Sequence, residues 1–367
     1  MNLPGSNYQI DSVVIDFMVN YNVPGLSIAI AKDGKMVYAK GYGFADHSTG
    51  EEVGVNSLFR IGETSIPITA IAIMKLIEEG KLALASKVFG DSGILGNKYG
   101  RLPYGVNITN ITVDELLHHT GGGWSGPEDP MNERDYRDHP YTQDQLINLA
   151  LQNIPLSSSP GSAFRFSNFG YFILGRVIEK ASGKTYADYV NERILRPIGI
   201  TDMQIESPTA EGKKTSEVTH YNGEEIPVFA DNKMDDKFYF LSSRADACSG
   251  WIASATDLLR LMVRVDGFPS KPDILDTTLM KSMLSGSKPN PHYACGWLLN
   301  DNLSNWFYLG EYPGTTVEIA RTTQGYCWAI LCNTFRPRAQ NYRMDLDQIM
   351  WKIINNPATK WPDKDLF

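Results

Sequence analysis

The sequence predicts an α+β fold in which one antiparallel sheet, assembled from both ends of the chain, is flanked by helices. Two observations support this prediction: β-prone runs occur near the start and near the end of the chain, and helical patterns with long loops fill the middle. Strands from the two ends must meet to form one sheet, so the helical middle is expected to be an insertion. We predict a discontinuous sheet-plus-helix domain of residues 1–80 and 245–367 and a mainly helical domain of residues 81–244.

The first elements are predicted to be a helix followed by a β-hairpin. From Gly25 to Ala45 the chain forms two apolar, β-prone runs with Asp33-Gly34 between them, which is typical of a hairpin turn. Before this hairpin, apolar residues recur at the spacing of one helix face. They are Ile10, Val13, Val14, Phe17 and Met18.

The middle of the chain predicts several helices. One is expected over residues 67–80, because Pro67 suits an early helical position. Thr112 and Glu115 form a capping-box pattern, and Gly121 is expected to end the helix that follows it. Further helical patterns cover residues 171–182 and 186–195.

The end of the chain returns to strands and closes with a helix. Its β-prone runs lie in the stretch NWFYLGEYPGTTVEIARTTQGYCWAILCNT, where Pro-Gly and Gln-Gly separate them. Apolar residues at helical spacing follow. They are Met344, Leu346, Ile349, Met350 and Ile353.

Composition excludes several classes of protein. The 367 residues include 34 Lys and Arg against 42 Asp and Glu, which gives a net charge of −8 and no electrostatic footprint for nucleic acid. With 42% hydrophobic residues, the chain is able to build a large core. No apolar run is long enough to span a membrane, and the first residues lack the pattern of an export signal.

Cysteines and histidines give no metal-site pattern. Cys327 and Cys332 lie five positions apart in a predicted strand, so they should face opposite sides of the sheet and cannot bridge each other. The four cysteines are therefore expected to be buried free thiols, which favours a reducing compartment. The chain also lacks a Gly-rich phosphate loop, so we expect a protein without metal or cofactor whose partner is a small-molecule substrate or ligand.

Several motifs resemble those of one known superfamily. The segments VPGLSIAIAKDGKMVYAKGYGFAD, SLFRIGETSIPITAIAIMKLIEEGKL, ITVDELLHHTGG, PGSAFRFSNFGYFILGRVIEKASGKTYADYVNERILRPIGI and SGWIASATDLLRLM occur in this order. The chain resembles serine β-lactamases and penicillin-binding proteins over nearly its whole length, and within them the class C β-lactamase, esterase and D-aminopeptidase branch. The resemblance implies the β-lactamase/transpeptidase-like fold, with an active-site cleft between the two predicted domains. It also implies an active site with a nucleophilic serine, a lysine one turn later, a Tyr-x-Asn motif and a Lys-Thr-Gly or His-x-Gly strand.

The chain departs from the family pattern at the nucleophile. The Ser-x-x-Lys motif falls on the four residues that begin with Glu63, so Glu63 takes the place of the serine and Ile66 that of the lysine. A shift by two residues does not restore the motif, because Ser65 has Ile68 three positions later. The resemblance therefore implies that acyl-serine chemistry is lost, and a carboxylate there would repel a tetrahedral oxyanion.

The other two motifs depart as well. The Tyr-x-Asn motif falls on Phe166, Ser167 and Asn168, which keeps the asparagine and loses the tyrosine hydroxyl. The third motif falls on the residues from Tyr308 to Gly310, since Pro-Gly follows at the usual distance, and Tyr308 stands where the family has lysine or histidine.

These replacements suggest a different acid–base site. Glu63 would be desolvated by Ile66, Phe166, Tyr308 and Trp297, and a carboxyl group in apolar surroundings titrates near neutrality, as a general acid or base requires. Glu63 and Tyr308 are the predicted catalytic residues. The predicted substrate contacts are Ile66, Phe166, Asn168, Trp297 and Gly310.

Three functional interpretations remain open. The first is a repurposed, cofactor-independent lyase, isomerase or cyclase that uses Glu63. The second is a pseudoenzyme that binds a small molecule or peptide, in which Glu63 only favours the first turn of a helix through the macrodipole. The third is a residual esterase, amidase or acyltransferase in which Glu63 activates water.

Overall fold

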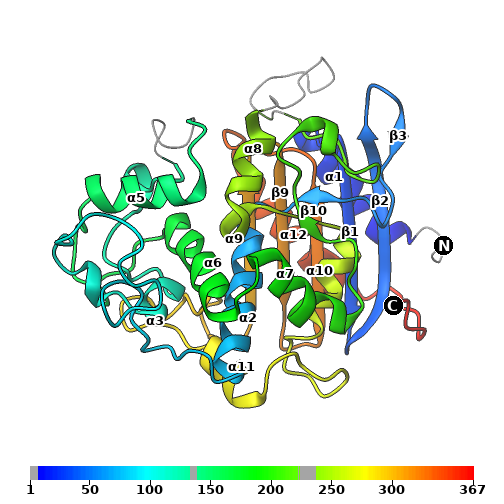
Figure 1. Cartoon of the computed structure of the whole chain (residues 1–367). Helices are drawn as coiled ribbons and strands as arrows, with labels where there is room; N and C mark the ends of the chain where they lie inside the picture. The colour runs from blue at the N-terminus through cyan, green and yellow to red at the C-terminus, as the bar shows by residue number, and fades with distance from the viewer. Residues whose placement is uncertain (1–6, 133–138, 222, 224–236) are drawn as a thin grey trace.

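The computed structural model describes residues 7–132, 139–221, 223 and 237–367. In these residues a seven-stranded antiparallel sheet has the order β3-β2-β1-β10-β9-β8-β7 (Figure 1). Its strands are β1 (Gly25–Lys32), β2 (Lys35–Asp46), β3 (Glu51–Glu52), β7 (Leu298–Leu299), β8 (Trp306–Tyr312), β9 (Thr315–Arg321) and β10 (Tyr326–Cys332). The prediction of one antiparallel sheet built from both ends of the chain and flanked by helices is confirmed.

The centre of the sheet joins the two ends of the chain. Strand β1 pairs with β10, with Ala29 opposite Ala329, and on its other side β1 pairs with β2 through the predicted hairpin. The turn of this hairpin has positive φ at both Asp33 (50°) and Gly34 (75°), as a tight turn between twisted strands requires. Both neighbours of β1 are therefore fixed by turn chemistry and by a long-range pairing.

Helices cover both faces of this sheet. On the outer face, α1 (Tyr8–Tyr21) and α12 (Tyr342–Ile354) pack against each other and bury apolar residues of β1, β2 and β10. On the inner face lie α2 (Ser65–Glu78) and α10 (Ala255–Met262), which belong to the larger core. Figure 1 shows α2, α7 and α9 in front of the sheet, with α12 behind it.

The described middle of the chain contains several helices. Its helices are α3 (Val113–Leu117), α5 (Gln143–Asn153), α6 (Asn168–Ser182), α7 (Tyr186–Val190), α8 (Lys237–Arg244) and α9 (Asp246–Ser249), and α11 (Thr277–Met283) follows α10. The short 3-10 and π segments are η1 (Gly62–Thr64), η2 (Ile108–Asn110), η3 (Gly126–Glu128), η4 (Asn191–Leu195), η5 (Arg196–Ile198) and η6 (Ala210–Gly212). A small sheet of order β4-β6-β5 joins β4 (Phe59–Arg60), β6 (Trp251–Ala253) and β5 (Gln204–Ile205). The division into two domains stays a prediction.

One predicted helix end is wrong. The capping box of Thr112 and Glu115 is present, but α3 ends at Leu117 rather than near Gly121. The chain leaves the helix earlier because His119 has a left-handed φ of 54°, and Thr120 N–H then donates back to the carbonyl of Glu115 at 2.7 Å. This is a helix-terminating turn made without glycine at the left-handed position.

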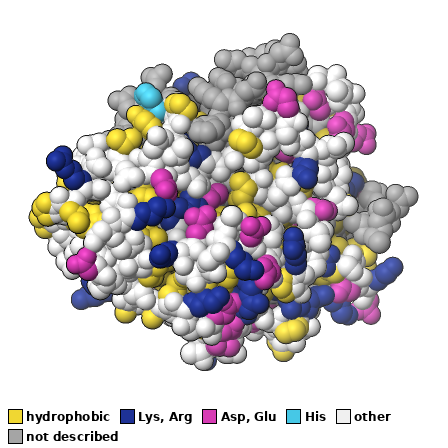
Figure 2. Space-filling view, viewed as in Figure 1, with side chains coloured by type: hydrophobic (Ala, Val, Ile, Leu, Met, Phe, Trp, Pro, Cys, Tyr) yellow, Lys and Arg dark blue, Asp and Glu magenta, His cyan; other side chains and the backbone are white. Residues whose placement is uncertain are grey.

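The cysteines agree with the sequence-based expectation. All four cysteines are free and buried, and Cys327 and Cys332 belong to the cores on opposite faces of the sheet. On the face shown in Figure 2, acidic and basic side chains are interspersed. Among the described residues, no helix has the length and apolar character needed to cross a membrane.

Candidate active site at Glu63

Glu63 lies where β4 turns into α2. It occupies η1, the short 3-10 segment whose last residue is followed directly by the first residue of α2. Two backbone hydrogen bonds hold this turn, from Ile61 N–H to the carbonyl of Trp251 at 3.1 Å and from Thr64 N–H to the carbonyl of Ile61 at 3.0 Å. The partly exposed side chain of Glu63 borders a cavity of about 140 Å³.

Backbone and side-chain donors surround the carboxylate of Glu63. Glu311 N–H, on β8, donates to its Oε2 at 3.0 Å, and Asn168 Nδ2 donates to its Oε1 at 3.4 Å. Its own backbone N–H also donates to the carboxylate. Burial raises the pKa of Glu63 from 4.5 to about 7, and these hydrogen bonds oppose the rise because they favour the charged form.

Close approach of β8 makes this arrangement possible. A Cβ atom on Gly310 would lie 2.3 Å from Thr64 Oγ1 and 2.5 Å from the carbonyl oxygen of Ile61. Only glycine therefore lets the strand come near enough to η1 for Glu311 N–H to reach Glu63. The predicted site residue Gly310 therefore contributes by allowing the close approach of β8 to η1, not by a side-chain contact.

Asn168 is the second predicted residue that lines the cavity. It begins α6, after Ser167 caps the helix by accepting the N–H of Gly170 at 3.0 Å. No described residue hydrogen-bonds to the buried amide oxygen of Asn168, while its amide nitrogen faces Glu63. Its side chain thus holds Glu63 with one end and has an unused acceptor at the other.

The other predicted site residues lie around this cavity rather than in its wall. Ile66 and Trp297 are both buried in the main core. Ile66 reaches it from the buried side of α2. Phe166 is 37% exposed, with its ring 4.4 Å from that of His119. None of the three is among the residues that line the cavity.

Tyr308 is buried below the site. Its hydroxyl bonds to that of Tyr293, which in turn lies 2.7 Å from His119 Nε2. Burial raises the pKa of Tyr308 well above its ordinary value, and the charge of Glu63 adds to this effect. Tyr308 does not line the cavity, so its predicted catalytic role stays a prediction.

The structure adds lining residues that no sequence motif indicated. They come from the loop after η3, from α8 and α9, and from the end of β8: Met131, Asn132, Leu241, Arg244, Ala245, Cys248, Ser249, Tyr312 and Pro313. Tyr312 and Pro313 follow Gly310 closely and could have been found from that neighbourhood. Leu241, Arg244 and Cys248 lie nearly two hundred residues after Glu63, and no local pattern connects them with it.

A second carboxyl group titrates abnormally behind Asn168. Asp129 is fully buried and accepts the backbone N–H groups of Met131 at 2.8 Å and Phe169 at 3.2 Å. Burial raises its pKa to about 7, against the effect of these hydrogen bonds. Asp129 does not line the cavity, and its hydrogen bonds fix the loop before Met131 to the start of α6.

Two groups of side chains in the described residues have the chemistry of metal ligands, and each also contacts other parts of the protein. They are Asp114, His118 and Cys295, and Glu206, Glu217 and His220. In the first group, both ring nitrogens of His118 lie 3.0 Å from backbone carbonyl oxygens. In the second, Arg60 pairs with Glu206 at 2.6 Å and its backbone N–H donates to His220 Nε2 at 3.1 Å. The first group is therefore occupied by hydrogen bonds. In the second group Glu206 Oε2, Glu217 Oε1 and His220 Nδ1 accept no hydrogen bond from a described residue, but the positive charge of Arg60 beside Glu206 opposes a metal cation there.

The fold and this site define a protein of the β-lactamase and penicillin-binding-protein class. The chain belongs to the Beta-lactamase family, whose model matches residues 10–348. The resemblance inferred from the sequence is thereby confirmed at the level of the superfamily.

Known relatives are distant. Protein flp of Staphylococcus aureus (strain COL) is 25% identical over 336 residues, which cover 89% of this chain and 63% of that protein. The chain therefore spans less than two thirds of the length of this curated relative.

Solved structures share the fold at low sequence identity. An octameric penicillin-binding protein homologue from Pyrococcus abyssi matches with a TM-score of 0.74 and 23% identity, over 94% of this chain and 77% of that one. D-amino acid amidase from Ochrobactrum anthropi SV3, complexed with L-phenylalanine amide, matches with a TM-score of 0.75 and 21% identity, over 95% of this chain and 98% of that one. At these identities the likeness establishes the fold.

Proposed function

We propose that this protein is a cofactor-independent enzyme in which Glu63 acts as general acid or base on a small polar molecule, in a reaction of the lyase, isomerase or cyclase type. The observation that carries the proposal is a carboxyl group with a pKa of about 7 at the wall of a cavity. At neutral pH such a group is present in both protonation states, so it accepts and returns a proton with little cost.

The contacts of Glu63 argue against acyl transfer through a tetrahedral intermediate. The backbone N–H groups of Glu63 and Glu311 both donate to the Glu63 carboxylate. Donors of this kind stabilise an oxyanion only when they are free to face it, and here a negative group already occupies them. Loss of the acyl-serine reaction is therefore part of the proposal.

Nearby nucleophiles lack activation. The hydroxyl of Ser65 is buried and accepts the N–H of Trp251 at 3.3 Å. Burial raises the pKa of Cys248 well above its ordinary value, which disfavours the reactive thiolate. Ser249 also borders the cavity, but no lysine or histidine is among the described lining residues to take its proton.

Asn168 and Arg244 supply the polar contacts that a substrate needs. The unpartnered amide oxygen of Asn168 is an acceptor that a ligand hydroxyl or amine is able to satisfy. Arg244 contributes a cation to the same wall, held by the carbonyls of His139 at 2.8 Å and Tyr141 at 3.2 Å. A polar ligand with a hydrogen-bond donor group fits this combination.

The unpartnered oxygen of Asn168 equally favours a second candidate, a protein that binds such a ligand without converting it. The two candidates differ in whether Glu63 transfers a proton to or from the bound molecule. Binding alone requires only the hydrogen-bonding capacity of the side chain, and glutamine preserves most of it.

Comparative metabolite conversion tests the proposal. Purified protein and its Glu63→Gln variant are incubated with small-molecule extracts at pH 7, and mass spectrometry records which compounds disappear and which form. We expect compounds that the original protein converts and that Glu63→Gln leaves unchanged, whereas Glu51→Gln, at an exposed position of β3, should convert them normally. Equal conversion by Glu63→Gln would contradict an acid–base role.

Acyl-enzyme chemistry is tested separately. The protein is incubated with benzylpenicillin and with a fluorophosphonate, and its intact mass is measured. We expect no covalent adduct. A stoichiometric adduct would show that a nucleophile is active and would overturn the proposed loss of acyl transfer.

A further inference from the structure

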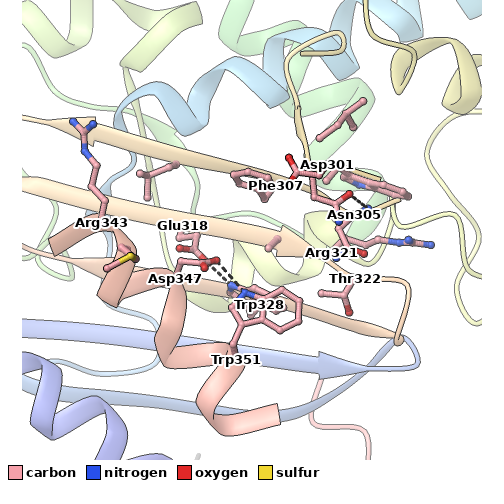
Figure 3. Close-up of a pocket in the computed structure, with 16 residues that line it drawn as sticks. Asp301, Asn305, Phe307, Glu318, Arg321, Thr322, Trp328, Arg343, Asp347 and Trp351 are labelled. Carbon is pink, nitrogen blue, oxygen red and sulfur yellow. Dashed lines mark hydrogen bonds between the residues drawn. The ribbon is translucent and has the colours of Figure 1, made fainter. Parts of the chain in front are cut away.

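A second, larger cavity lies on the opposite face of the main sheet. It has a volume of about 590 Å³, which is in the range of small-molecule sites, and it lies between β8, β9, β10 and the helix α12 (Figure 3). None of its lining residues borders the Glu63 cavity. We call it the outer pocket.

The outer pocket contains a carboxylate in an unusual place. All seven residues of β9 are buried, and Glu318, in the middle of this strand, is only 3% exposed. Its Oε1 accepts the indole N–H of Trp328 at 2.7 Å, while no described residue hydrogen-bonds to its Oε2. Because Glu318 lines the pocket, its second oxygen is available to a hydrogen-bond donor of a bound ligand.

A second carboxylate lies beside Glu318 in the pocket. Asp347 projects from α12 and accepts the indole N–H of Trp351 at 3.2 Å, and Figure 3 shows the two carboxylates side by side. Burial raises the pKa of Glu318 to about 8, and the negative charge of Asp347 adds to this rise. The two acids therefore repel each other unless a proton or a cation lies between them.

The described chain supplies no cation for this pair. Arg343, at one end of the pocket, forms an ion pair with Glu311. Arg321, at the other end, donates to the carbonyls of Asp266 at 2.9 Å and Ser304 at 3.1 Å, and lies 4.0 Å from the ring of Trp306. No lysine or arginine of the described residues is recorded in an ion pair with Glu318 or Asp347.

We propose that the outer pocket binds an organic ammonium ion, a primary or secondary amine on an apolar or aromatic body, with its nitrogen between Glu318 and Asp347. An ammonium group offers N–H donors to both carboxylates and neutralises their repulsion. Trp328 and Trp351 turn their indole N–H edges toward the two carboxylates, and their rings supply, with Phe307, an apolar wall for the body of the ligand. A metal ion fits less well, because a hard cation needs more oxygen ligands than these carboxylates provide.

Three probes of similar shape and different charge test this proposal. They are 2-phenylethylamine, 2-phenylethanol and 3-phenylpropionate, and their binding to the full protein is followed by calorimetry and by quenching of tryptophan fluorescence. We expect the amine to bind about tenfold more tightly than the alcohol and the carboxylate to bind least, because only the amine pairs with both acids. Equal binding of amine and alcohol would overturn the proposal.

Variants locate the effect in the pocket. Glu318→Gln keeps an acceptor for Trp328 and removes the charge, so the preference for the amine should fall to about twofold or less. Asp347→Asn provides the same test at a less buried position, should Glu318→Gln fail to fold. Asp345→Asn is the matched control, since Asp345 lies on the same helix and bonds instead to the hydroxyl of Tyr21 at 2.6 Å.

The variant data also have outcomes that contradict the proposal. An amine preference that survives in both Glu318→Gln and Asp347→Asn would place the amine elsewhere. Calcium is added as a fourth probe, and displacement of 2-phenylethylamine by Ca²⁺ at lower concentration would identify a metal site in place of an amine site. Because Glu63 is not part of this pocket, a failure here leaves the proposed reaction at Glu63 untouched.

Discussion

The carboxylate of Glu63 accepts the backbone N–H of Glu311 at 3.0 Å. This contact joins the first turn before α2 to the end of β8, two segments separated by nearly 250 residues. A negative charge is thereby fixed at a strand edge where a backbone donor would otherwise be open to a ligand. The consequences of that contact can be measured through pH and through the space around Gly310.

The stability of the protein should depend on the protonation of Glu63. Because burial raises its pKa from 4.5 to about 7, the folded state holds a proton that the unfolded state releases in this window. The free energy of unfolding should therefore fall as pH rises from 4.5 to 7, and Glu63→Gln, which does not titrate, should become more stable than the original protein by about 1–3 kcal/mol above pH 8. Urea unfolding at pH 5 and pH 8 measures the difference, with Glu51→Gln as control. A difference independent of pH would mean that Glu63 titrates normally.

A methyl group at position 310 should open the contact between β8 and η1. The added Cβ of Gly310→Ala would overlap Thr64 Oγ1 and the carbonyl of Ile61, so the strand must move away from Glu63. We expect a loss of about 1–3 kcal/mol in unfolding free energy and a lower pH midpoint for Glu63, whose carboxylate becomes more hydrated. Gly105→Ala is the control, because its nearest atom, Ile108 Cγ1, lies at 3.9 Å. Unchanged stability in Gly310→Ala would show that the strand has room at this point.

The buried ion pair beside β4 should be costly to break. Arg60 Nε and Glu206 Oε1 lie 2.6 Å apart, and both side chains are fully buried. Glu206→Ala removes the carboxylate that pairs with the Arg60 guanidinium, so the unfolding free energy should fall by about 3–5 kcal/mol. Chemical denaturation followed by tryptophan fluorescence measures this loss. The double variant Arg60→Met/Glu206→Leu should recover most of it, and equal instability of both variants would assign the loss to packing instead of charge.

The four cysteines should be unreactive in the folded protein. All are buried and free, and burial raises the pKa of Cys327 well above its ordinary value. A thiol reagent such as 5,5′-dithiobis(2-nitrobenzoate) should therefore label none of them quickly in buffer and all four in urea. Fast labelling of one thiol under native conditions, identified by peptide mass spectrometry, would reveal local opening at that cysteine.

Patterns along the chain predicted the fold well because they record which face of each element is buried. The Asp33-Gly34 hairpin, the capping box at Thr112 and the final helix all follow from local spacing and turn chemistry. The end of α3 did not follow, since His119 adopts a left-handed conformation that tertiary hydrogen bonds support. Local rules describe a helix end only where local residues decide it.

The candidate site was predictable in part. Motif positions identified Glu63 and Asn168, which border one cavity, and Gly310, whose lack of a side chain admits β8. They did not identify Arg244 or Cys248, because the packing of α9 against η1, and of α8 against α9, depends on contacts between distant segments. The outer pocket did leave one sequence signal, a glutamate in the otherwise apolar or small-polar run TTVEIA of a buried strand.

The pairing of β1 with β10, in which Ala29 lies opposite Ala329, also has a consequence for folding during synthesis. A ribosome releases β1 and its hairpin early, yet the strand that covers the open edge of β1 is synthesised three hundred residues later. During that interval an apolar strand edge is exposed to other chains. Long-range pairing of this kind also slows folding, because the entropy cost of bringing the two distant strands together precedes the stabilisation from their contacts. Chains interrupted before β10 should therefore aggregate, and yield of the protein should depend on how well the early hairpin is protected during synthesis.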